Sequence, residues 1–260
     1  VLPGAIVREM VENDRIVGGI TPQAADAARK LYASFVKGDI LTTDATTAEF
    51  TKLVENAYRD VNIAFANELA RVSELIGVDV GEVIALANHH PRVNILQPGP
   101  GVGGHCIPID PYFIIQAAQQ VTPLLQAARR VNRTMPEEVA ITASQLAPPA
   151  GRIALLGVAY KGNVADDRES PSFEIARRLS EAGYQVSMHD PYVKAYKVAV
   201  EDVVRGADLL VILTDHSDYR SLVPSALATM VRQRVVFDTR RVVDSKAWET
   251  AGFLVYQLGN

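Results

Sequence analysis

Apolar residues recur at intervals of three and four along the middle of the chain, between residues 50 and 76. They are Phe50, Leu53, Val54, Ala57, Val61, Ala64, Phe65, Leu69, Val72, Leu75 and Ile76. Residues 45–88 contain no proline, and their glycines are Gly77 and Gly81. This spacing predicts one helix of roughly 30 residues, from Thr46 or Thr47 to Leu75, and a second helix over 80–88. A helix of that length with so much apolar surface is typical of a spine between domains or of a dimer contact.

Helix and strand patterns alternate ahead of this long helix. Pro3 and Gly4 open an amphipathic run, and Thr21 followed by Pro22 makes a good N-cap with a first-turn proline. The patterns predict helices over 3–11 and 22–36, and strands over 15–19 and 39–43. Two strands are too few for a domain, so we expect residues 1–44 to be the incomplete end of an α/β domain.

Short apolar runs alternate with helical patterns after the linker at residues 147–151, which reads APPAG. Strands are expected over 152–157, 185–189, 208–214, 234–238 and 253–257, and helices near 171–182, 199–205, 217–231 and 244–251. This alternation predicts a doubly wound parallel sheet over residues 151–260. Between the two α/β parts, residues 45–147 form a central helical domain. It includes a turn-rich loop over 91–113 and helices over 114–120 and 122–146.

The composition describes a globular α/β protein. Apolar residues make up 48% and charged residues 22% of the 260 residues, which excludes a disordered chain. A net charge of -4 disfavours a nucleic-acid-binding protein. No apolar run approaches the roughly 20 residues that a membrane span needs. The single cysteine, Cys106, excludes a disulfide framework and favours a reducing compartment, so we expect a cytoplasmic protein.

A glycine-rich loop precedes that cysteine. Gly99–Gly104 spells G-x-G-x-x-G, but Pro98 interrupts any strand before it, and Pro108 and Pro111 argue against a helix after it. We therefore do not interpret the loop as a dinucleotide fingerprint. Glycines beside such a rigid, apolar segment favour a backbone that approaches a ligand closely.

A second glycine motif follows the first strand of the C-terminal sheet. Residues 157–162 read G-x-A-x-x-G, yet the next helix starts only at Ser170 and Pro171. This predicts a Rossmann-like topology with a different phosphate arrangement, in which Lys161 and Arg168 supply positive charge. The alternative is a solvated charged loop.

Cys106 has polar neighbours that suit two kinds of chemistry. A thiol nucleophile is one, although the adjacent His105 is badly placed to act as its base. A metal site from the histidines and carboxylate near Cys106 lacks ligand-type spacing, so we expect no metal. Lys52 and Asn56 lie four residues apart on one face of the long helix. Lys52 is either a snorkelling surface residue or a buried proton shuttle or oxyanion stabiliser.

Four segments together resemble the UDP-glucose/GDP-mannose dehydrogenase family, and the resemblance covers essentially the whole chain. They are TTAEFTKLVENAYRDVNIAFANELA (46–70), HPRVNILQPGPGVGGHCIPIDPYF (90–113), GVAYKGNVADDRESPSFEIA (157–176) and FDTRRVVD (237–244). The resemblance implies an N-terminal NAD-binding Rossmann domain, a central helix that dimerises and a C-terminal UDP-binding domain. It also implies a homodimer that works in polysaccharide biosynthesis, with most of the NAD site outside this chain.

The family oxidises a sugar C6 alcohol to a carboxylate with two NAD⁺, through a cysteine thiohemiacetal and thioester. By resemblance, Cys106 is the nucleophile, Lys52 and Asn56 stabilise the oxyanion, and Asp110 assists proton transfer. The residues expected to bind the UDP-sugar are Arg92, Leu96, Gly101, Val102, Gly103, Tyr160, Lys161, Arg240 and Arg241, of which Arg92 would reach the partner subunit's substrate. Arg168 is expected to reach NAD.

Two departures bear on the substrate. His105 and Ile109 stand where UDP-glucose dehydrogenases commonly have Ser and Lys. These departures favour a UDP-N-acetylhexosamine over UDP-glucose and do not distinguish N-acetylmannosamine from N-acetylglucosamine. By resemblance, UDP-N-acetyl-D-mannosamine is the expected substrate, with UDP-N-acetylglucosamine and UDP-glucose as the alternatives. A rival interpretation is a truncated, non-catalytic module that dimerises and binds UDP-sugar.

Overall fold

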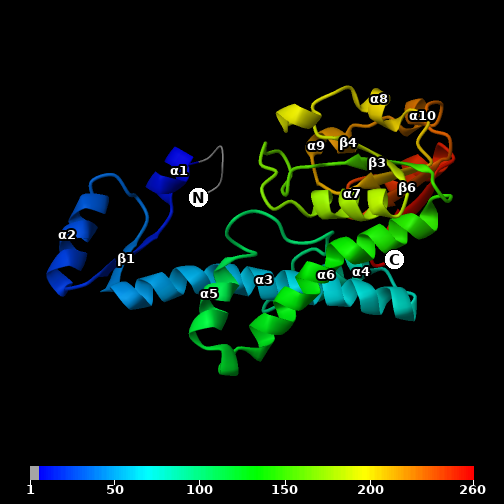
Figure 1. Ribbon diagram of the computed structural model, residues 1–260. Helices are drawn as coiled ribbons and strands as arrows, with labels where there is room; N and C mark the ends of the chain where they lie inside the picture. Colours follow the sequence, from blue (N-terminus) through cyan, green and yellow to red (C-terminus); the bar gives the residue numbers. More distant parts are fainter. Residues whose placement is uncertain (1–5) are drawn as a thin grey trace.

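The first part of the computed structural model is a small α/β unit with two parallel strands (Figure 1). The structure describes residues 6–260, so the expected helix opening at Pro3 and Gly4 lies outside it. The elements are α1 (Ile6–Glu12), β1 (Arg15–Gly19), α2 (Pro22–Tyr32) and β2 (Ile40–Asp44). Helix α2 ends four residues before the predicted end. Thr21 caps it as predicted, with its hydroxyl accepting the N–H of Ala24.

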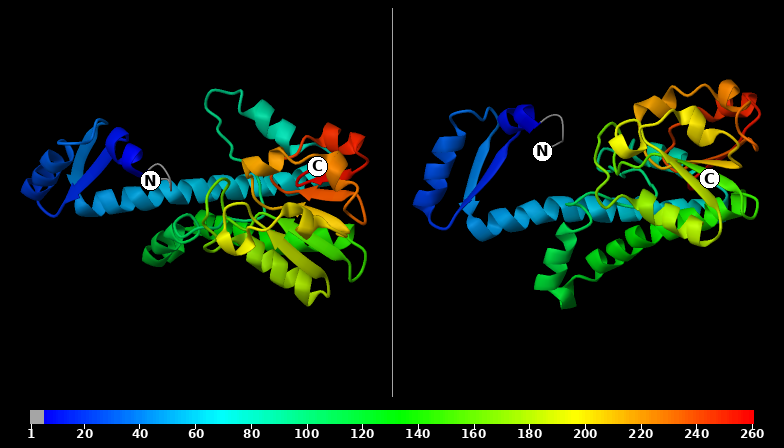
Figure 2. Two further views of the ribbon diagram at one scale, coloured as in Figure 1. Left: turned by 90° about the horizontal axis from the view of Figure 1, so that it is seen from above. Right: turned by 45° about the horizontal axis from the view of Figure 1, so that its top comes forward.

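A single long helix leads from this unit to the rest of the molecule (Figures 1 and 2). Helix α3 (Ala45–Ile76) has 32 residues, begins at the N-cap Asp44 and ends at the left-handed Gly77. The helices that follow it are α4 (Val80–Ala87), α5 (Asp110–Ala117), the 3-10 turn η1 (Gln119–Val121) and α6 (Pro123–Leu146). Helix α6 packs along α3. The expectation of a loop up to residue 113 is wrong, because Pro111 lies in the first turn of α5, where proline is tolerated.

The C-terminal part is a five-stranded parallel sheet in the order β4-β3-β5-β6-β7. Its strands are β3 (Arg152–Leu156), β4 (Gln185–His189), β5 (Leu209–Ile212), β6 (Val235–Asp238) and β7 (Leu254–Gln257). Its helices are α7 (Pro171–Glu181), η2 (Lys194–Tyr196), α8 (Val200–Val204), α9 (Ser217–Arg220), α10 (Pro224–Leu227) and α11 (Ser245–Thr250). The single helix expected over 217–231 is two short helices, and Pro224 begins the second of them. The α/β class and the doubly wound sheet are confirmed.

The sheet and the central helices share one core. Ala66 and Ala70 of α3 and Met135 of α6 are buried together with Ile153 and Leu155 of β3. A second core on the other face of the sheet surrounds Trp248. The end of α3 opposite this core carries the β1–β2 unit (Figure 2). Among residues 6–260, no helix is both long and apolar enough to cross a bilayer.

Candidate active site

Three of the predicted catalytic residues meet where α5 crosses α3. Lys52 and Asn56 lie one turn apart on α3, and both donate to the same carboxylate oxygen, Oδ2 of Asp110. Asp110 is the first residue of α5 and is buried. Two side chains from one helix therefore fix a carboxylate that begins another.

Cys106 lies one turn ahead of that carboxylate. The N–H groups of Ile109 and Asp110 donate to the carbonyl of Cys106, at 3.0 and 2.8 Å. This turn ties the cysteine backbone to the start of α5. The thiol is free and half-buried, so a substrate can reach it. Among the described residues, no group of three or more His, Cys, Asp or Glu side chains could hold a metal ion.

The glycine-rich loop packs against the C-terminal part of the chain itself. A Cβ at Gly103 would lie 2.6 Å from Cβ of Tyr160 and 2.8 Å from the carbonyl oxygen of Glu169, and one at Gly99 would overlap Arg240. We expected the close approach to be that of a ligand. In the structure the glycines make room for the protein's own residues, so the loop forms the seam between central helices and sheet.

Three asparagines, Asn62, Asn67 and Asn88, hold the segment 94–99, which leads into the glycine-rich loop and has no regular secondary structure. Their bonds are Leu96 N to Asn62 Oδ1 (2.9 Å), Asn62 Nδ2 to Asn94 O (2.7 Å), Ile95 N to Asn88 Oδ1 (2.7 Å), Asn88 Nδ2 to Ile95 O (3.0 Å) and Gly99 N to Asn67 Oδ1 (2.9 Å). Sequence reasoning missed these residues. For Asn62 and Asn67, the available signal was an amide on a helix face that otherwise carries apolar residues; Asn88 caps the end of α4.

A buried network extends from Asn67 into the helix pair. Asn67 donates to Asn132 of α6 at 3.0 Å, and Asn132 donates to Asp60 at 2.8 Å. Asp60 also pairs with Arg129, and both side chains are buried. Burial raises the pKa of Asp60, although Arg129 and Asn132 oppose the rise. The network joins α3, α6 and the loop at Gly99 in one hydrogen-bonded unit.

The turn after β3 does not present free donors to a phosphate. The N–H groups of Val158 and Ala159 both donate to Asp190 at 2.8 Å, and His216 lies 3.0 Å from the same oxygen. Burial alone would raise the pKa of Asp190. The bonds from His216 and from backbone N–H groups outweigh burial and hold this pKa well below its usual range. An internal carboxylate thus occupies the position where a dinucleotide fold would place phosphate.

Cationic and aromatic side chains remain at the edge of the sheet. Arg240 lies 3.6 Å from Asp215. Burial raises the pKa of Asp215, but the charge of Arg240 and the hydrogen bonds from backbone N–H groups together outweigh burial and lower this pKa overall. Burial and Asp166 raise the pKa of Tyr160. Lys161 is half-buried and has no partner among residues 6–260.

Three further predicted arginines have different surroundings. Arg168 pairs with Asp166, at 2.8 and 2.6 Å, and its carbonyl accepts the N–H of Gly104. Arg92 is exposed and makes no side-chain bond within the described residues. Arg241 points away from Arg240. It bonds Asp79 at the start of α4 at 2.9 Å, and this places it between the sheet and the central helices.

The other predicted binding residues lie along the seam. Leu96 is half-buried where Asn62 holds its backbone. The neighbouring Gly101 and Val102 are half-buried, and a Cβ at Gly101 would lie 3.1 Å from Pro171 and 3.2 Å from Pro136. The loop therefore runs from the asparagines on α3 to the N-terminus of α7.

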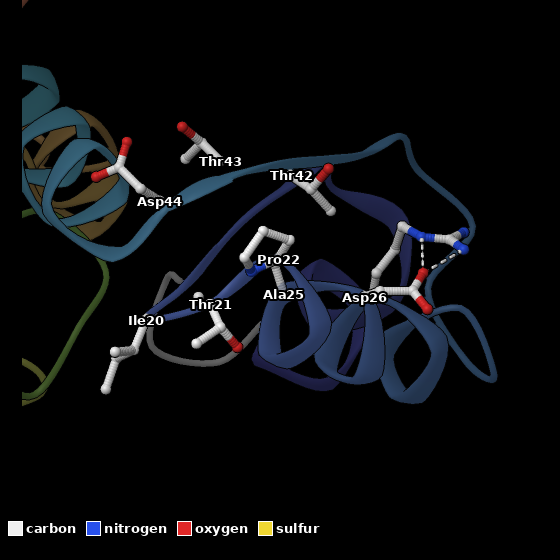
Figure 3. Close-up of a pocket in the computed structure, with 10 residues that line it drawn as sticks. Ile20, Thr21, Pro22, Ala25, Asp26, Thr42, Thr43 and Asp44 are labelled. Atoms are coloured by element: carbon white, nitrogen blue, oxygen red, sulfur yellow. Dashed lines mark hydrogen bonds and ion pairs between the residues drawn. The ribbon is translucent and has the colours of Figure 1, made fainter.

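A separate crevice of about 310 Å³ lies at the carboxyl ends of β1 and β2 (Figure 3). Thr21, Thr42 and Thr43 line it with hydroxyl groups, and Asp44, the N-cap of α3, lies at its edge. Its cation, Arg29, is already paired with an aspartate of the same helix, as the dashed lines in Figure 3 show. Parallel α/β units bind ligands at this edge, and the lining suits an uncharged polar group better than a diphosphate.

Comparison with known proteins identifies the central helices and the sheet. The model of the UDP-glucose/GDP-mannose dehydrogenase central domain matches residues 46–134, and that of the family's UDP binding domain matches residues 154–245. The chain is 45% identical to the UDP-N-acetyl-D-mannosamine dehydrogenase of Methanocaldococcus jannaschii, over all of this chain and 62% of that protein. It is 47% identical to the NDP-N-acetyl-D-galactosaminuronic acid dehydrogenase of Ralstonia solanacearum, over 95% of this chain and 60% of that protein.

A solved structure agrees with these matches. The UDP-D-ManNAc dehydrogenase of Pyrococcus horikoshii superposes with a TM-score of 0.91 at 43% identity, over all of this chain and 63% of that one. The chain thus spans about three fifths of the length of these relatives. On this agreement of sequence, fold and domain order, the chain belongs to the UDP-glucose/GDP-mannose dehydrogenase family.

Proposed function

We propose that this chain is the catalytic and sugar-nucleotide-binding part of an NAD-dependent dehydrogenase. Its reaction is the oxidation of the C6 alcohol of a UDP-N-acetylhexosamine, UDP-N-acetyl-D-mannosamine first, to the carboxylate. The observation that carries the proposal is the Lys52–Asn56–Asp110 cluster, one turn from the free thiol of Cys106. Relatives named for N-acetylated sugar nucleotides support the substrate class.

The proposed chemistry assigns a role to each of these four residues. The sulfur of Cys106 adds to an aldehyde carbon at C6, which forms a C–S bond and leaves a negative charge on oxygen. The ammonium of Lys52 and the amide of Asn56 stabilise that oxyanion. Asp110 accepts a proton from the water that attacks the later thioester, the C–S bond breaks, and Cys106 leaves as a thiolate while the carboxylic acid forms.

NAD⁺ supplies the hydride acceptor for both oxidations when it is bound. The crevice at β1 and β2 would hold the nicotinamide riboside end, because Thr21, Thr42 and Thr43 offer hydroxyl groups to the ribose. Its Arg29 is already paired with Asp26, so no free cation of the lining opposes the positively charged nicotinamide ring. Helix α3 begins at this crevice, and Lys52 lies eight residues further on. At about 1.5 Å per residue, this puts the catalytic cluster roughly 12 Å from the N-cap.

The UDP-sugar lies along the seam in this proposal. Tyr160, Lys161 and Arg240 bind it from the sheet side, and the loop that contains Gly101–Gly103 supports it from the helix side. Because Arg241 is bound to Asp79, we assign it to the junction of the two parts rather than to the ligand. Exposed Arg92 is free to reach a partner subunit.

Calorimetry on the 260-residue chain tests the proposal. The chain is expected to bind UDP, and to bind NAD⁺ weakly because the described β1–β2 unit has no glycine fingerprint for a diphosphate. Lys161→Ala should weaken UDP binding about ten-fold or more, since one charge-assisted bond is worth about 1.5–3 kcal/mol. Lys246→Ala, an exposed lysine on α11, is the matched control and should change nothing. Tight NAD⁺ binding without UDP binding would overturn the assignment of the two ends.

A further inference from the structure

The segment that follows β5, residues 214–217, is bonded along its whole length to the loop that follows β3. The bonds are Thr214 Oγ1 to Ala159 O (2.6 Å), Gly162 N to Asp215 Oδ1 (3.1 Å), Asn163 N to His216 Nδ1 (2.9 Å) and Ser217 N to Asn163 Oδ1 (2.9 Å). Strands β3 and β5 are neighbours in the parallel sheet, so both segments leave it at the same edge. Lys161 lies between the bonded residues. The backbone on both sides of this lysine is therefore held, while its side chain has no partner among residues 6–260.

His216 anchors segment 214–217 to the interior of the sheet domain. Its side chain and that of Asp190 are fully buried. Because the N–H of Asn163 donates to Nδ1 of His216, the ring proton lies on Nε2, which is 3.0 Å from the carboxylate of Asp190. Asp190 also accepts two backbone N–H groups of the turn after β3. The segment therefore cannot shift against the sheet without breaking buried hydrogen bonds.

Asp215 of this segment also faces Arg240, which follows β6. The oxygen that accepts the N–H of Gly162, Oδ1, lies 3.6 Å from a terminal nitrogen of the guanidinium. At that separation the charges attract but form no hydrogen bond, so Arg240 keeps its donors for a ligand. The two side chains are 40% and 25% exposed, and they lie at the edge where doubly wound sheets bind ligands.

We propose that Asp215 is a positioning residue that fixes Lys161 and Arg240 at the separation at which both engage one diphosphate. This inference rests on the proposed function, which assigns the two cations to the UDP-sugar, and adds the group that orients them. A carboxylate beside a diphosphate opposes binding by its charge. Holding a flexible arginine and a loop in place before binding lowers the entropic cost of ordering them, and in this assignment that gain exceeds the repulsion.

Calorimetry with UDP tests the link from Asp215 to Arg240. Asp215→Asn keeps an oxygen for the N–H of Gly162 and loses the charge that attracts Arg240. It should weaken UDP binding about three-fold or more. In a chain that already carries Arg240→Ala, Asp215→Asn should cause no further loss of UDP affinity, because the group it positions is gone.

Asp215→Ala tests the link to the lysine loop, because it also removes the acceptor of the Gly162 N–H. It should weaken UDP binding about ten-fold or more, and thus more than Asp215→Asn does. The difference between the two variants should disappear in a chain that carries Lys161→Ala, where they should bind UDP within about two-fold of each other. A general loss of structure would lower UDP affinity in every background alike.

Asp218→Asn is the matched control. It removes the same charge three residues further on, where the carboxylate accepts from Tyr192 at 3.1 Å, and it should leave UDP affinity within about two-fold. Circular dichroism and urea unfolding establish that each variant is folded. The proposal is overturned if Asp215→Asn binds UDP as tightly as the unchanged chain or more tightly, or if it causes the same loss beside Arg240→Ala. Absence of UDP binding by the unchanged chain would instead refute the proposed function, and this inference with it.

Discussion

Asp190 and Asp110 are both buried, but different kinds of hydrogen-bond donor hold their carboxylates. Asp190 accepts from backbone N–H groups, which cannot move without unfolding the turns after β3 and β4. Asp110 accepts from the side chains of Lys52 and Asn56, which can rotate toward a substrate. Backbone donors suit a permanent internal anion, whereas side-chain donors suit a carboxylate that exchanges partners during a reaction.

The first prediction at this scale concerns Cys106. The chain should bind a UDP-sugar carrying a C6 aldehyde and form a covalent adduct, because the half-buried Cys106 lies one turn from the Lys52–Asn56–Asp110 cluster that we propose stabilises the oxyanion. Native mass spectrometry should detect the adduct on the unchanged chain and not on Cys106→Ser. The variant should keep UDP affinity within about two-fold, since one sulfur-to-oxygen exchange removes no UDP contact. An adduct of equal yield on Cys106→Ser would refute the nucleophile assignment.

At the scale of elements, the sequence predicted the helices and strands well, but it predicted the loop between the central helices and the sheet poorly. Periodicity located α3 and the five strands of the sheet, because each buries one continuous apolar set. It extended the loop to residue 113, since Pro111 was counted as a helix breaker although it starts α5. The resemblance supplied Cys106, Lys52, Asn56 and Asp110 as a group.

Contacts between distant segments were not predictable in the same way. The partners of Asn62, Asn67 and Asn88 are loop backbone groups, and no periodicity encodes which amide meets which carbonyl. Adjacent Arg240 and Arg241 were expected to act together. They diverge because Arg241 has a left-handed backbone, with φ at 52°, which turns its side chain toward Asp79.

The hydrogen bonds of Asn67 to Gly99 and Asn132 lead to a prediction. Asn67→Ala leaves the N–H of Gly99 and the amide of Asn132 without their partner in a buried place, which should cost about 1–3 kcal/mol of unfolding free energy. Because Gly99 packs on Arg240, UDP affinity should also fall, by about three-fold or more. Urea unfolding and calorimetry measure the two effects. The exposed Asn13→Ala is the control, and a loss of stability with unchanged UDP affinity would show that the loop does not position Arg240.

At the scale of the whole molecule, helices α3 and α4 expose an apolar surface that is large enough to pack against another chain. The residues are Phe50, Val54, Tyr58, Phe65, Val72, Leu75 and Ile76 of α3 and Val83 and Leu86 of α4. Monomeric proteins rarely expose so many large apolar side chains along one pair of elements. We therefore propose a homodimer that forms on these helices.

Light scattering at micromolar concentration tests this assembly. The unchanged chain should give the mass of two chains, and Phe65→Glu combined with Val72→Glu should give one, because a desolvated carboxylate is too costly in an apolar contact. Val223→Glu, at an exposed valine of the sheet domain, should remain dimeric. A monomeric mass for the unchanged chain would contradict the proposal.

Helix α3 fixes the distance between the crevice at β1 and β2 and the Lys52–Asn56–Asp110 cluster. It starts at the edge of the crevice at the carboxyl ends of β1 and β2, carries Lys52 and Asn56 two to three turns later, and enters the core of the sheet domain at Ala66. A bend of 5° within its first 12 Å would displace the crevice by roughly 1 Å relative to the catalytic cluster, which is enough to spoil a near-attack geometry. The 32 residues of α3 include neither glycine nor proline, the two residues that kink helices most readily. In the proposed reaction, the rigidity of this one element therefore sets how accurately a hydride acceptor and a covalently held substrate can face each other.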